Sequence, residues 1–408
     1  MPEDRPPARP PHGQTSPPAW WERRILRAVL AGMGSPPVTV VLWNGEELRA
    51  GSGEPVGRVR LRERSVLRDF VRSPEVAFGD AYCDGRLEVE GDLAGFLIRT
   101  FRPGRHGAAW LRALNRVLGG RPHPHGARRS RDNVHHHYDL GNEFYAMWLD
   151  ERMVYTCAYF PTPEATLEEA QLAKLDLVCR KLALRPGERV VEAGCGWGSL
   201  ALHMAEHYGV RVRAFNVSSE QIRHAREQAR ERGLEKQVEF VEDDYRSITG
   251  TWDAFVSVGM LEHVGRAHYR ALGQLIDRSL GPDGRGLLHF IGHTRPTPTS
   301  PWLERRIFPG AYMPSLREAL AVLEPRALAV ADVENLRRHY ALTLRHWLGR
   351  FERAADRVEA MYDARFVRMW RLYLASSLVS FESGSTQLWQ VLFTRSADTA
   401  HPWTRAHL

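Results

Sequence analysis

Two patterns of apolar and polar positions divide the chain. Between residues 189 and 292, short apolar runs such as RVVEAGC and WDAFVSVG are separated by amphipathic stretches such as SSEQIRHAREQARERG. Short apolar runs bounded by turns are typical of buried strands, and the stretches between them have the period of a helix. Strands that alternate with helices form a parallel sheet with helices on both faces. The pattern therefore predicts an α/β fold for this part of the chain.

Further elements follow on its C-terminal side. RAHYRALGQLIDRSLGPDG is predicted as one helix and GLLHFIG as the strand after it. A long helical stretch begins near Arg337, and the apolar run QLWQVLFTR is predicted as a closing strand. On the N-terminal side, residues 119–133 are rich in glycine, proline and arginine, which is typical of an exposed linker. We therefore place one domain at residues 134–408.

The N-terminal part of the chain has a different character. Residues 1–18 contain many prolines and few apolar side chains, so we expect a disordered tail. Short strands with glycine turns follow at residues 38–95 and predict a small α+β domain at 19–118. Before them, AWWERRILRAVLAGMG places apolar side chains on one helical face beside three arginines. This helix either covers the domain core or touches lipid as a basic amphipathic surface. Its apolar face comprises Trp20, Trp21, Ile25, Leu26, Val29 and Leu30.

Composition narrows the choice of partners and compartment. The formal net charge of +7 favours an anionic partner, which could be nucleic acid, an anionic lipid surface or a phosphorylated substrate. Apolar runs of about 18 residues are absent, so a membrane span is not expected. The four cysteines lack CxxC or zinc spacing, and the N-terminus lacks an apolar signal core, so we expect a reducing cytoplasm. The histidines at 135–137 lack a carboxylate at helical spacing, and a metal site is not expected.

A glycine-rich loop carries the first chemical signal. Gly194, Gly196 and Gly198 follow a predicted strand directly and open a predicted helix, where open α/β sheets bind cofactors. A dinucleotide fingerprint would need the spacing GxGxxG and an acidic residue about twenty positions later. This chain has GxGxG, an acid (Glu192) two residues before the first glycine, and Asn216 after the next strand. That arrangement favours S-adenosylmethionine as the cofactor.

Several motifs together resemble one family, the cyclopropane-fatty-acyl-phospholipid synthases and the related mycolic acid methyltransferases. The resemblance covers residues 134–395, and GDAYCDGRLEVEGDLAGFL in the N-terminal part looks like the bacterial phospholipid-acting branch. It implies a class I methyltransferase fold, Rossmann-like with a mostly parallel seven-stranded sheet, and an N-terminal lipid-binding domain. The motifs that carry it are HHYDLGNEFYAMWLD, MVYTCAYF, EAGCGWGSLA, FNVSSEQ, DDYR, SVGMLEHVG, LLHFIG, ENLRRHYALTLRHW and QLWQVLFTR.

The resemblance implies a reaction at an acyl-chain double bond. A cis alkene attacks the sulfonium methyl of S-adenosylmethionine, and loss of a proton from the resulting carbocation closes a cyclopropane ring. Aromatic faces would stabilise the cation, and water must be excluded. By resemblance the base is a bound bicarbonate ion, and small-anion binding needs hydrogen-bond donors, including backbone N–H groups near Cys157 and Ile291. The implied catalytic residues are Cys157, Glu262, His289, Ile291 and Tyr340.

The implied roles of two of these residues need separate comment. Glu262 beside an anion would orient a neighbouring donor or accept the hydroxyl of bicarbonate. Cys157 would line the ion site, or be a plain core thiol, because an electron-rich alkene offers an enzyme nucleophile nothing to attack. Part of the family has a cysteine where this chain has Ser377. Either this cysteine is dispensable, as the carbocation chemistry indicates, or this chain has lost activity.

The resemblance also assigns residues to the cofactor. Asn216 would hydrogen-bond the ribose hydroxyls in place of the usual acid, and Asp244 would accept the adenine amino group. Tyr138 either lies over the cofactor or is a half-buried packing residue. The full implied set is Tyr138, Tyr155, Thr156, Glu192, Gly194, Cys195, Gly196, Trp197, Gly198, Asn216, Val217, Ser218, Gln221, Asp244, Tyr245 and Arg246.

The family reading leads to expectations about partners and to two rivals. We expect a homodimer that acts peripherally on phospholipid bilayers at the inner face of the cell membrane, and no nucleic-acid partner. The motifs of nucleic-acid methyltransferases, (D/N)PPY or a catalytic cysteine after proline, do not occur. One rival is a methyltransferase that makes methylene- or methyl-branched acyl chains from the same cation. The other is a lipid-binding protein that keeps the fold without turnover.

Overall fold

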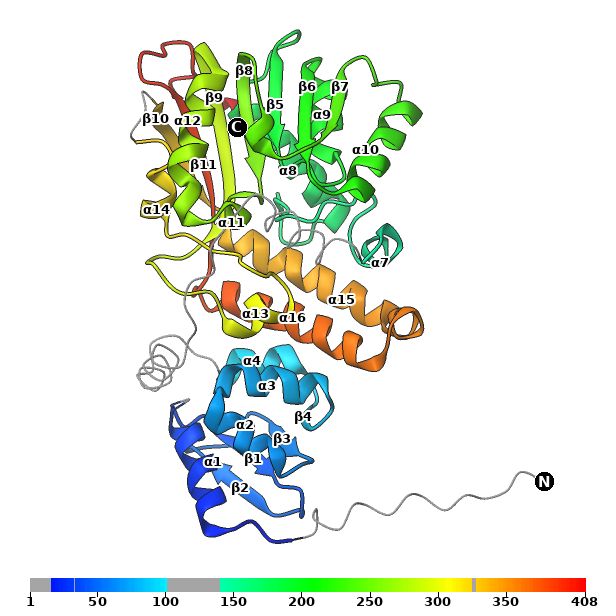
Figure 1. Ribbon diagram of the computed structural model, residues 1–408, viewed down its shortest axis with the longest axis vertical. Coiled ribbons are helices and arrows are strands. Elements are labelled where there is room, and N and C mark those ends of the chain that lie inside the picture. Colours follow the sequence, from blue (N-terminus) through cyan, green and yellow to red (C-terminus); the bar gives the residue numbers. More distant parts are fainter. Residues whose placement is uncertain (1–15, 33, 101–139, 325–327) are drawn as a thin grey trace, which may run out of the picture. The chain divides into compact units, whose positions relative to one another are not determined.

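The computed structural model defines the helices and strands of both parts of the chain (Figure 1). The predicted linker, residues 119–133, lies outside the described residues, as does nearly all of the predicted tail, residues 1–18. Contacts between residues divide the chain into two units, the first formed largely by the N-terminal part and the second by the C-terminal part. The described ranges are 16–32, 34–100, 140–324 and 328–408.

The first unit contains a four-stranded sheet in the order β2-β1-β3-β4. Strand β1 pairs in parallel with β3, and the other two pairings are antiparallel. The mixture of short strands and helices confirms the small α+β region predicted from the sequence. Its elements are α1 (Trp20–Gly32), β1 (Val38–Val41), β2 (Glu47–Ala50), β3 (Arg58–Leu61), α2 (Ser65–Arg72), α3 (Pro74–Cys83), β4 (Leu87–Glu90) and α4 (Leu93–Thr100).

Only part of the predicted apolar face of α1 is buried. Leu26, Val29 and Leu30 are buried as expected, but the side chains of Trp20 and Trp21 are 72% and 41% exposed. The reason is Glu22, which is buried and accepts hydrogen bonds from the guanidinium of Arg64 and from the N–H of Ala19. Burying Glu22 turns the preceding tryptophans toward solvent. The core-covering alternative therefore holds for Leu26, Val29 and Leu30 and not for the two tryptophans, whose exposure is compatible with the lipid-touching alternative.

The first unit also includes Glu359–Val379, a segment distant in sequence. Most of it belongs to α16 (Ala364–Glu382). The Nε of Arg365 donates to Asp84 at 2.8 Å, and the guanidinium of Arg368 lies 4.3 Å from the ring centre of Tyr82. These contacts connect α16 to the end of α3, so the unit boundaries do not follow chain order.

The second unit is built on a seven-stranded sheet in the order β10-β11-β9-β8-β5-β6-β7. Strand β11 is antiparallel to both of its neighbours, and the other described pairings are parallel. This topology confirms the predicted Rossmann-like, mostly parallel sheet. The strands are β5 (Arg189–Ala193), β6 (Arg211–Asn216), β7 (Val238–Glu242), β8 (Trp252–Val258), β9 (Leu280–Gly292), β10 (Leu328–Asn335) and β11 (Gln387–Arg395).

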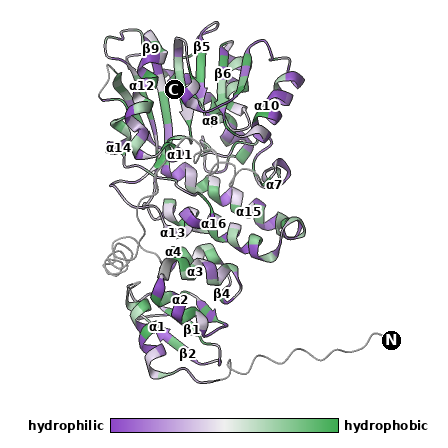
Figure 2. Cartoon of the chain, in the orientation of Figure 1, coloured by the Kyte–Doolittle hydropathy of each residue, from purple (hydrophilic) through white to green (hydrophobic). Residues whose placement is uncertain are grey.

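Helices cover both faces of this sheet, as the alternating pattern predicts. Successive strand residues point to opposite faces: Val190 and Val256 join one buried cluster, and Val191 and Phe255 join the other. Figure 2 shows the strands as mainly apolar and α10 as strongly polar on its outer side. The helices of this unit are α7 (Asn142–Ala146), α8 (Leu167–Lys181), α9 (Ser199–Tyr208), α10 (Ser219–Glu231), α11 (Leu261–Val264), α12 (Tyr269–Ser279), α13 (Pro301–Arg306), α14 (Leu316–Leu320) and most of α15 (Arg337–Met361).

One predicted boundary in this unit is wrong. The sequence pattern extends the helix through Gly284, but α12 ends at Ser279 and β9 begins at Leu280. Leu280 pairs with Trp252 in the sheet, which draws the Gly-Pro-Asp-Gly segment into the strand. Strand β10 and helix α8 were not anticipated. Within the described ranges, no helix combines the length and the apolar character needed to cross a bilayer.

The strand order places a ligand site at one end of the sheet. Strands β6 and β7 follow β5 on one side, whereas β8 and β9 lie on its other side. Open α/β sheets bind ligands at the carboxyl ends of the strands where the order reverses. Here that point lies between β5 and β8. Helix α15 runs across the same end of the sheet (Figure 1).

Candidate active site

The glycine loop after β5 has the geometry of a cofactor loop. Gly194, Gly196 and Gly198 all have positive φ angles, of 85°, 54° and 85°. A Cβ atom on Gly196 would meet nothing within 4 Å, so the backbone there is open to a ligand. A Cβ atom on Gly198 would lie 2.6 Å from Phe240 and 2.8 Å from Ala225. One glycine thus allows close approach, and the other allows α10 and β7 to pack.

Asn216 connects the end of β6 to this loop. Its side-chain NH₂ donates to Gln221 Oε1 at 2.7 Å and to the carbonyl of Gly196 at 3.3 Å. Its Oδ1 accepts the N–H of Val217 at 2.9 Å. Ser218, two residues on, caps α10. The amide therefore fixes the two loops relative to each other, and its contact with the ribose stays a prediction.

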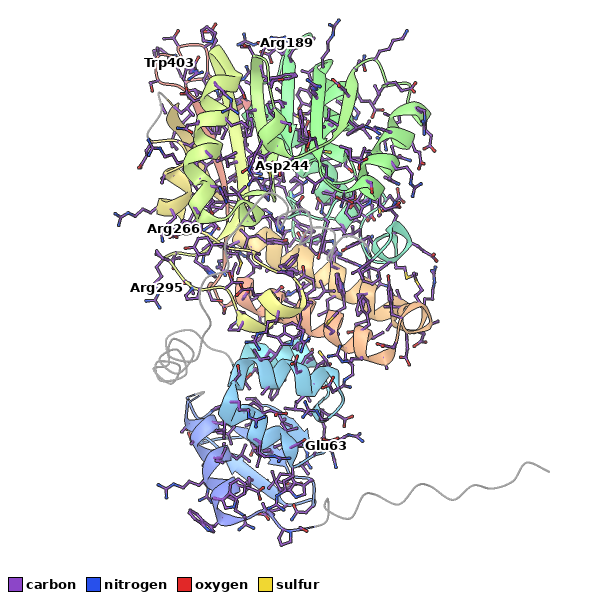
Figure 3. All side chains as sticks on the ribbon, in the orientation of Figure 1. Glu63, Arg189, Asp244, Arg266, Arg295 and Trp403 are labelled. Carbon is purple, nitrogen blue, oxygen red and sulfur yellow. The ribbon has the colours of Figure 1, made fainter. Side chains whose placement is uncertain are left out.

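Asp244, Tyr245 and Arg246 follow β7 at the same end of the sheet. In Figure 3, Asp244 lies at the end of the sheet opposite Arg189, the first residue of β5. The carboxylate of Asp244 accepts the N–H of Arg246 at 2.9 Å and its guanidinium at 2.8 Å. The buried hydroxyl of Tyr245 has no hydrogen-bond partner among the described residues. Three predicted cofactor residues thus lie together, with Asp244 already holding Arg246.

Glu262 is a buried carboxylate, and one of its two oxygens accepts a hydrogen bond. It lies on α11, just after β8, and its side chain is 5% exposed. Its Oε1 accepts the backbone N–H of Ile291 at 2.6 Å, and its Oε2 has no partner among the described residues. Burial raises the pKa of Glu262 to about 7. The Ile291 N–H, which we expected to face an anion, is therefore engaged by Glu262 instead.

His289 presents one free ring nitrogen. The ring is 2% exposed, and its Nδ1 accepts a hydrogen bond of 3.0 Å from the side-chain amide of Gln390. Burial holds the pKa of His289 well below its ordinary value, so the ring is neutral. An acceptor at Nδ1 places the proton on Nε2, which has no partner among the described residues.

Cys157 and Tyr340 converge on the same backbone carbonyl. The Sγ of Cys157 lies 3.9 Å from the oxygen of Leu336, which also accepts the N–H of Tyr340 at 3.1 Å. Leu336 donates in turn to Leu388, the sheet partner of Ile291. The cysteine is fully buried, and burial raises the pKa of its thiol far above the ordinary value. Cys157 is therefore a neutral thiol, which fits a wall of the site or a plain core thiol and not a nucleophile.

An aromatic cluster between the glycine loop and Tyr340 escaped the sequence analysis. Neighbouring rings in it have centroids 5.0–5.9 Å apart. Its members lie within the family motifs, but ring contacts among α7, the glycine loop and α15 cannot be read from sequence spacing. Such a cluster can stabilise a cation and exclude water. Its members are Tyr145, Trp148, Tyr155, Trp197, Tyr340 and Trp347.

The structure describes most of the remaining predicted site residues. Glu192 and Cys195 are buried at the end of β5 and in the glycine loop. Tyr155 and Thr156 are half-buried in the segment before Cys157. Tyr138 lies outside the described residues. Gln390, which the sequence analysis missed, was findable only from the pairing of β11 with β9.

Comparison with known proteins identifies the family. The family model described as mycolic acid cyclopropane synthetase matches residues 125–391, and a domain of unknown function matches residues 25–103. The chain is 35% identical to the cyclopropane-fatty-acyl-phospholipid synthase of Escherichia coli K12, over 86% of this chain and 92% of that protein. It is 34% identical to a probable fatty acid methyltransferase of Pseudomonas putida, over 90% of this chain and 95% of that protein.

Two further similarities agree. The tuberculostearic acid methyltransferase UfaA1 of Mycobacterium tuberculosis is 33% identical, over 90% of this chain and 89% of that protein. The crystal structure of the mycolic acid cyclopropane synthase CmaA1 with SAH and CTAB covers 65% of this chain and 98% of its own, with 29% identity and a TM-score of 0.62. The chain belongs to the mycolic acid cyclopropane synthetase family and is a cyclopropane-synthase-like methyltransferase that uses S-adenosylmethionine.

Proposed function

We propose that the protein converts cis double bonds in the acyl chains of membrane phospholipids into cyclopropane rings. The supporting observation is a pair of buried polar atoms, Glu262 Oε2 and His289 Nε2, that lack partners among the described residues. Glu262 follows β8 and His289 lies near the end of β9, and β8 is the sheet neighbour of β5, the strand that leads into the cofactor loop. An acceptor and a donor kept dry at such a place suit proton removal from a lipid cation.

S-adenosylmethionine supplies an electrophilic methyl group when bound. The alkene π electrons form the new bond to that methyl carbon, and the carbon–sulfur pair stays on sulfur as S-adenosylhomocysteine is released. A cation then remains on the acyl chain. The aromatic cluster around Trp148 and Trp347, both fully buried, would stabilise this charge and keep water away. Removal of a proton from the new methyl group leaves the electron pair that closes the ring.

A bicarbonate ion, when bound, would supply the basic oxygen. The residues present fit such an ion: the neutral imidazole of His289 can donate from Nε2, and Glu262 Oε2 can accept a hydroxyl. The thiol of Cys157 donates to the carbonyl of Ala158 at 3.1 Å, so it would form part of the wall. Glu262 and His289 would thus orient the base without exchanging protons with the lipid.

A peripheral position on a bilayer belongs to the same proposal. Helix α1 carries exposed Trp20 and Trp21 beside the exposed Arg24 and Arg27. Tryptophan and arginine on one helix suit the interface of an anionic lipid surface. We include in the proposal a homodimer at the inner face of the cell membrane, which would double the lipid contacts, and no nucleic-acid partner.

The names of two similar proteins support a branched acyl chain as a second possible product. The similar proteins include a probable fatty acid methyltransferase and a tuberculostearic acid methyltransferase. The same acyl cation, after a hydride shift and loss of a methyl proton, gives a methylene-branched chain. The choice depends on which proton lies closest to the base.

Incubation of the purified protein with S-adenosylmethionine and vesicles of a cis-monounsaturated phospholipid tests the proposal. We expect S-adenosylhomocysteine in proportion to a lipid product 14 mass units heavier, with upfield cyclopropane signals in proton NMR. A product that takes up two hydrogens on mild hydrogenation would identify the branched route. Vesicles of a saturated phospholipid are the control. Unchanged lipid in both would contradict a phospholipid substrate.

A further inference from the structure

A lysine on α8 is fully buried beneath the segment that precedes Cys157. Lys174 is 1% exposed, and its Nζ donates to Thr156 Oγ1 at 3.0 Å. A buried ammonium is costly unless charge and hydrogen bonds compensate for its desolvation. Neither the sequence motifs nor the proposed reaction explains why a lysine is buried at this place.

Two buried acidic groups outside α8 face this lysine. Asp150 and Glu192 are each 2% exposed and interact electrostatically with it. The Oε2 atom of Glu192 has no hydrogen-bond partner among the described residues. Burial raises the pKa of Glu192, and the positive charge of Lys174 opposes that rise. Burial dominates, so the acid at the start of the cofactor loop favours its protonated form even beside Lys174.

A glutamine one helical turn earlier holds the same segment. Gln171 is fully buried, and its side-chain amide donates to the carbonyl of Thr156 at 2.8 Å and to that of Val154 at 3.3 Å. From the other side, Asp150 accepts the N–H of Val154 at 2.8 Å. Residues 154–156 are therefore bonded through backbone and side chain to three buried residues, Gln171, Asp150 and Lys174, although they form neither helix nor strand.

The orientation of Thr156 has consequences at the site. Its Cγ2 lies 3.0 Å from the position a Cβ atom would take on Gly259, the residue after β8, where φ is 77°. Thr156 therefore packs against the carboxyl end of β8 through its methyl group, while its hydroxyl accepts from Lys174. Its neighbours in sequence are Tyr155, a member of the aromatic cluster, and Cys157.

We propose that Lys174 is a positioning residue that fixes the rotamer of Thr156, and so places Tyr155 and Cys157 between the ends of β5 and β8. Gln171 holds the backbone of the segment, and Lys174 holds its side chain. This role rests on the methyltransferase activity of the family and is independent of the lipid substrate and of the base.

Binding of S-adenosylhomocysteine, measured by calorimetry, tests the role without requiring turnover. We expect Lys174→Met and Thr156→Val each to raise the dissociation constant at least tenfold. The double variant should be no weaker than the worse single variant, because both changes remove one interaction. Lys174→Arg should restore part of the affinity, since it keeps the charge.

A matched control lies two turns along the same helix. Lys181 is also 1% exposed, but its ammonium pairs with Glu334 on β10. Lys181→Met should lower the thermal midpoint and leave the dissociation constant unchanged. If Lys174→Met fails to fold, Thr156→Val still decides, because it replaces a hydroxyl by a methyl group of similar size. Wild-type affinity in folded Thr156→Val would overturn the proposal, and so would equal loss of affinity in Lys181→Met.

Discussion

The carboxylate of Glu262 accepts a hydrogen bond of 2.6 Å from the backbone N–H of Ile291, and this bond fixes which carboxylate oxygen is left over. The free Oε2 is buried at the carboxyl end of the sheet, where charge on it is costly. A buried carboxylate oxygen without a partner is uncommon, and a ligand or a reaction that uses it is one explanation. The relationship therefore leads to a direct test.

Glu262→Gln should lower turnover at least 100-fold while the affinity for S-adenosylmethionine changes less than threefold. Glu262 would orient the base, and proton transfer contributes roughly 10²–10⁴-fold to enzymatic rates. The described hydrogen bond of its side chain joins it to Ile291 and not to the cofactor loop. Steady-state kinetics and calorimetry measure the two quantities. Glu318→Gln is a control, because both oxygens of that buried carboxylate are already bonded to Tyr312 and Ser315. Equal losses of turnover and affinity in Glu262→Gln would refute the assignment.

The pH dependence of activity should reflect the ionisation of Glu262. Burial raises the pKa of Glu262 to about 7, and the ionised form is the required acceptor. Turnover should therefore increase as the pH rises through about 7. Measurement of turnover as a function of pH, with saturating lipid and cofactor, tests this increase. The residual activity of Glu262→Gln should not show it.

The free energy of unfolding should respond to pH with the opposite sign. Between 4.5 and about 7 the folded protein binds more protons at Glu262 than the unfolded chain does, so stability falls as the pH rises through this window. At about 1.4 kcal/mol per pKa unit, the shift corresponds to roughly 3 kcal/mol. Chemical denaturation at pH 5 and pH 8 should show a smaller difference for Glu262→Gln than for the wild type. An unchanged difference would contradict the raised pKa.

His289 should depend on Gln390 for its tautomer. Gln390→Met removes the donor to Nδ1 but keeps the length of the side chain, so the proton on Nε2 is no longer fixed. We expect turnover to fall roughly tenfold, with a change in the nitrogen chemical shifts of His289 that NMR can detect. Thr394→Val, on the same strand and paired with Arg285, is the control. Wild-type turnover with a randomised tautomer would contradict this role.

Most strands of the large sheet could be predicted from the sequence, because an apolar run within the strand itself identifies each of them. Apolar runs identify β5 through β9, and the glycines after β5 identify the loop at its end. Strand β10 escaped because its residues are mostly half-exposed or exposed, so the run LAVADVEN lacks the apolar contrast of a buried strand. The exposure at the N-terminal end of α1 could not be read from the sequence for another reason. An ion pair with Arg64, 42 residues away, decides that Glu22 is buried and Trp20 is not.

The site was predicted only as far as motifs extend. The motif SVGMLEHVG gives Glu262, but its bond to Ile291 depends on how α11 turns back toward β9. Gln390 and Lys174 carry no local signal, since each acts on a residue more than fifteen positions away. Periodicity cannot show such pairings. They arise from the register of β11 on β9 and from the packing of α8 under the segment before Cys157.

Two glycines of the same loop should behave differently when replaced by alanine. At Gly198 a Cβ atom would lie 2.6 Å from Phe240, and overpacking of this kind costs roughly 1–3 kcal/mol. The left-handed conformation at this position adds about 1–2 kcal/mol. Gly198→Ala should therefore lower the thermal midpoint strongly.

Gly196→Ala carries the left-handed cost alone, because nothing lies within 4 Å of its Cβ position. It should remain folded and bind S-adenosylhomocysteine at least tenfold more weakly, since the methyl group would occupy space that the cofactor approaches. Thermal denaturation and calorimetry of both variants check this contrast. Normal affinity in folded Gly196→Ala would show that the open side of the loop does not face the cofactor.

The exposed tryptophans of α1 should contribute to lipid binding. Trp20 and Trp21 are 72% and 41% exposed, so replacing both by alanine should leave the fold of the first unit intact. Aromatic side chains gain free energy at a membrane interface, and the adjacent arginines favour anionic headgroups. We expect the double variant to bind vesicles with anionic phospholipid roughly tenfold more weakly, a loss of about 1.4 kcal/mol. Trp403, which is 98% exposed near the C-terminus (Figure 3), provides the matched control. Co-sedimentation that weakens equally in Trp403→Ala would mean that α1 is not the lipid contact.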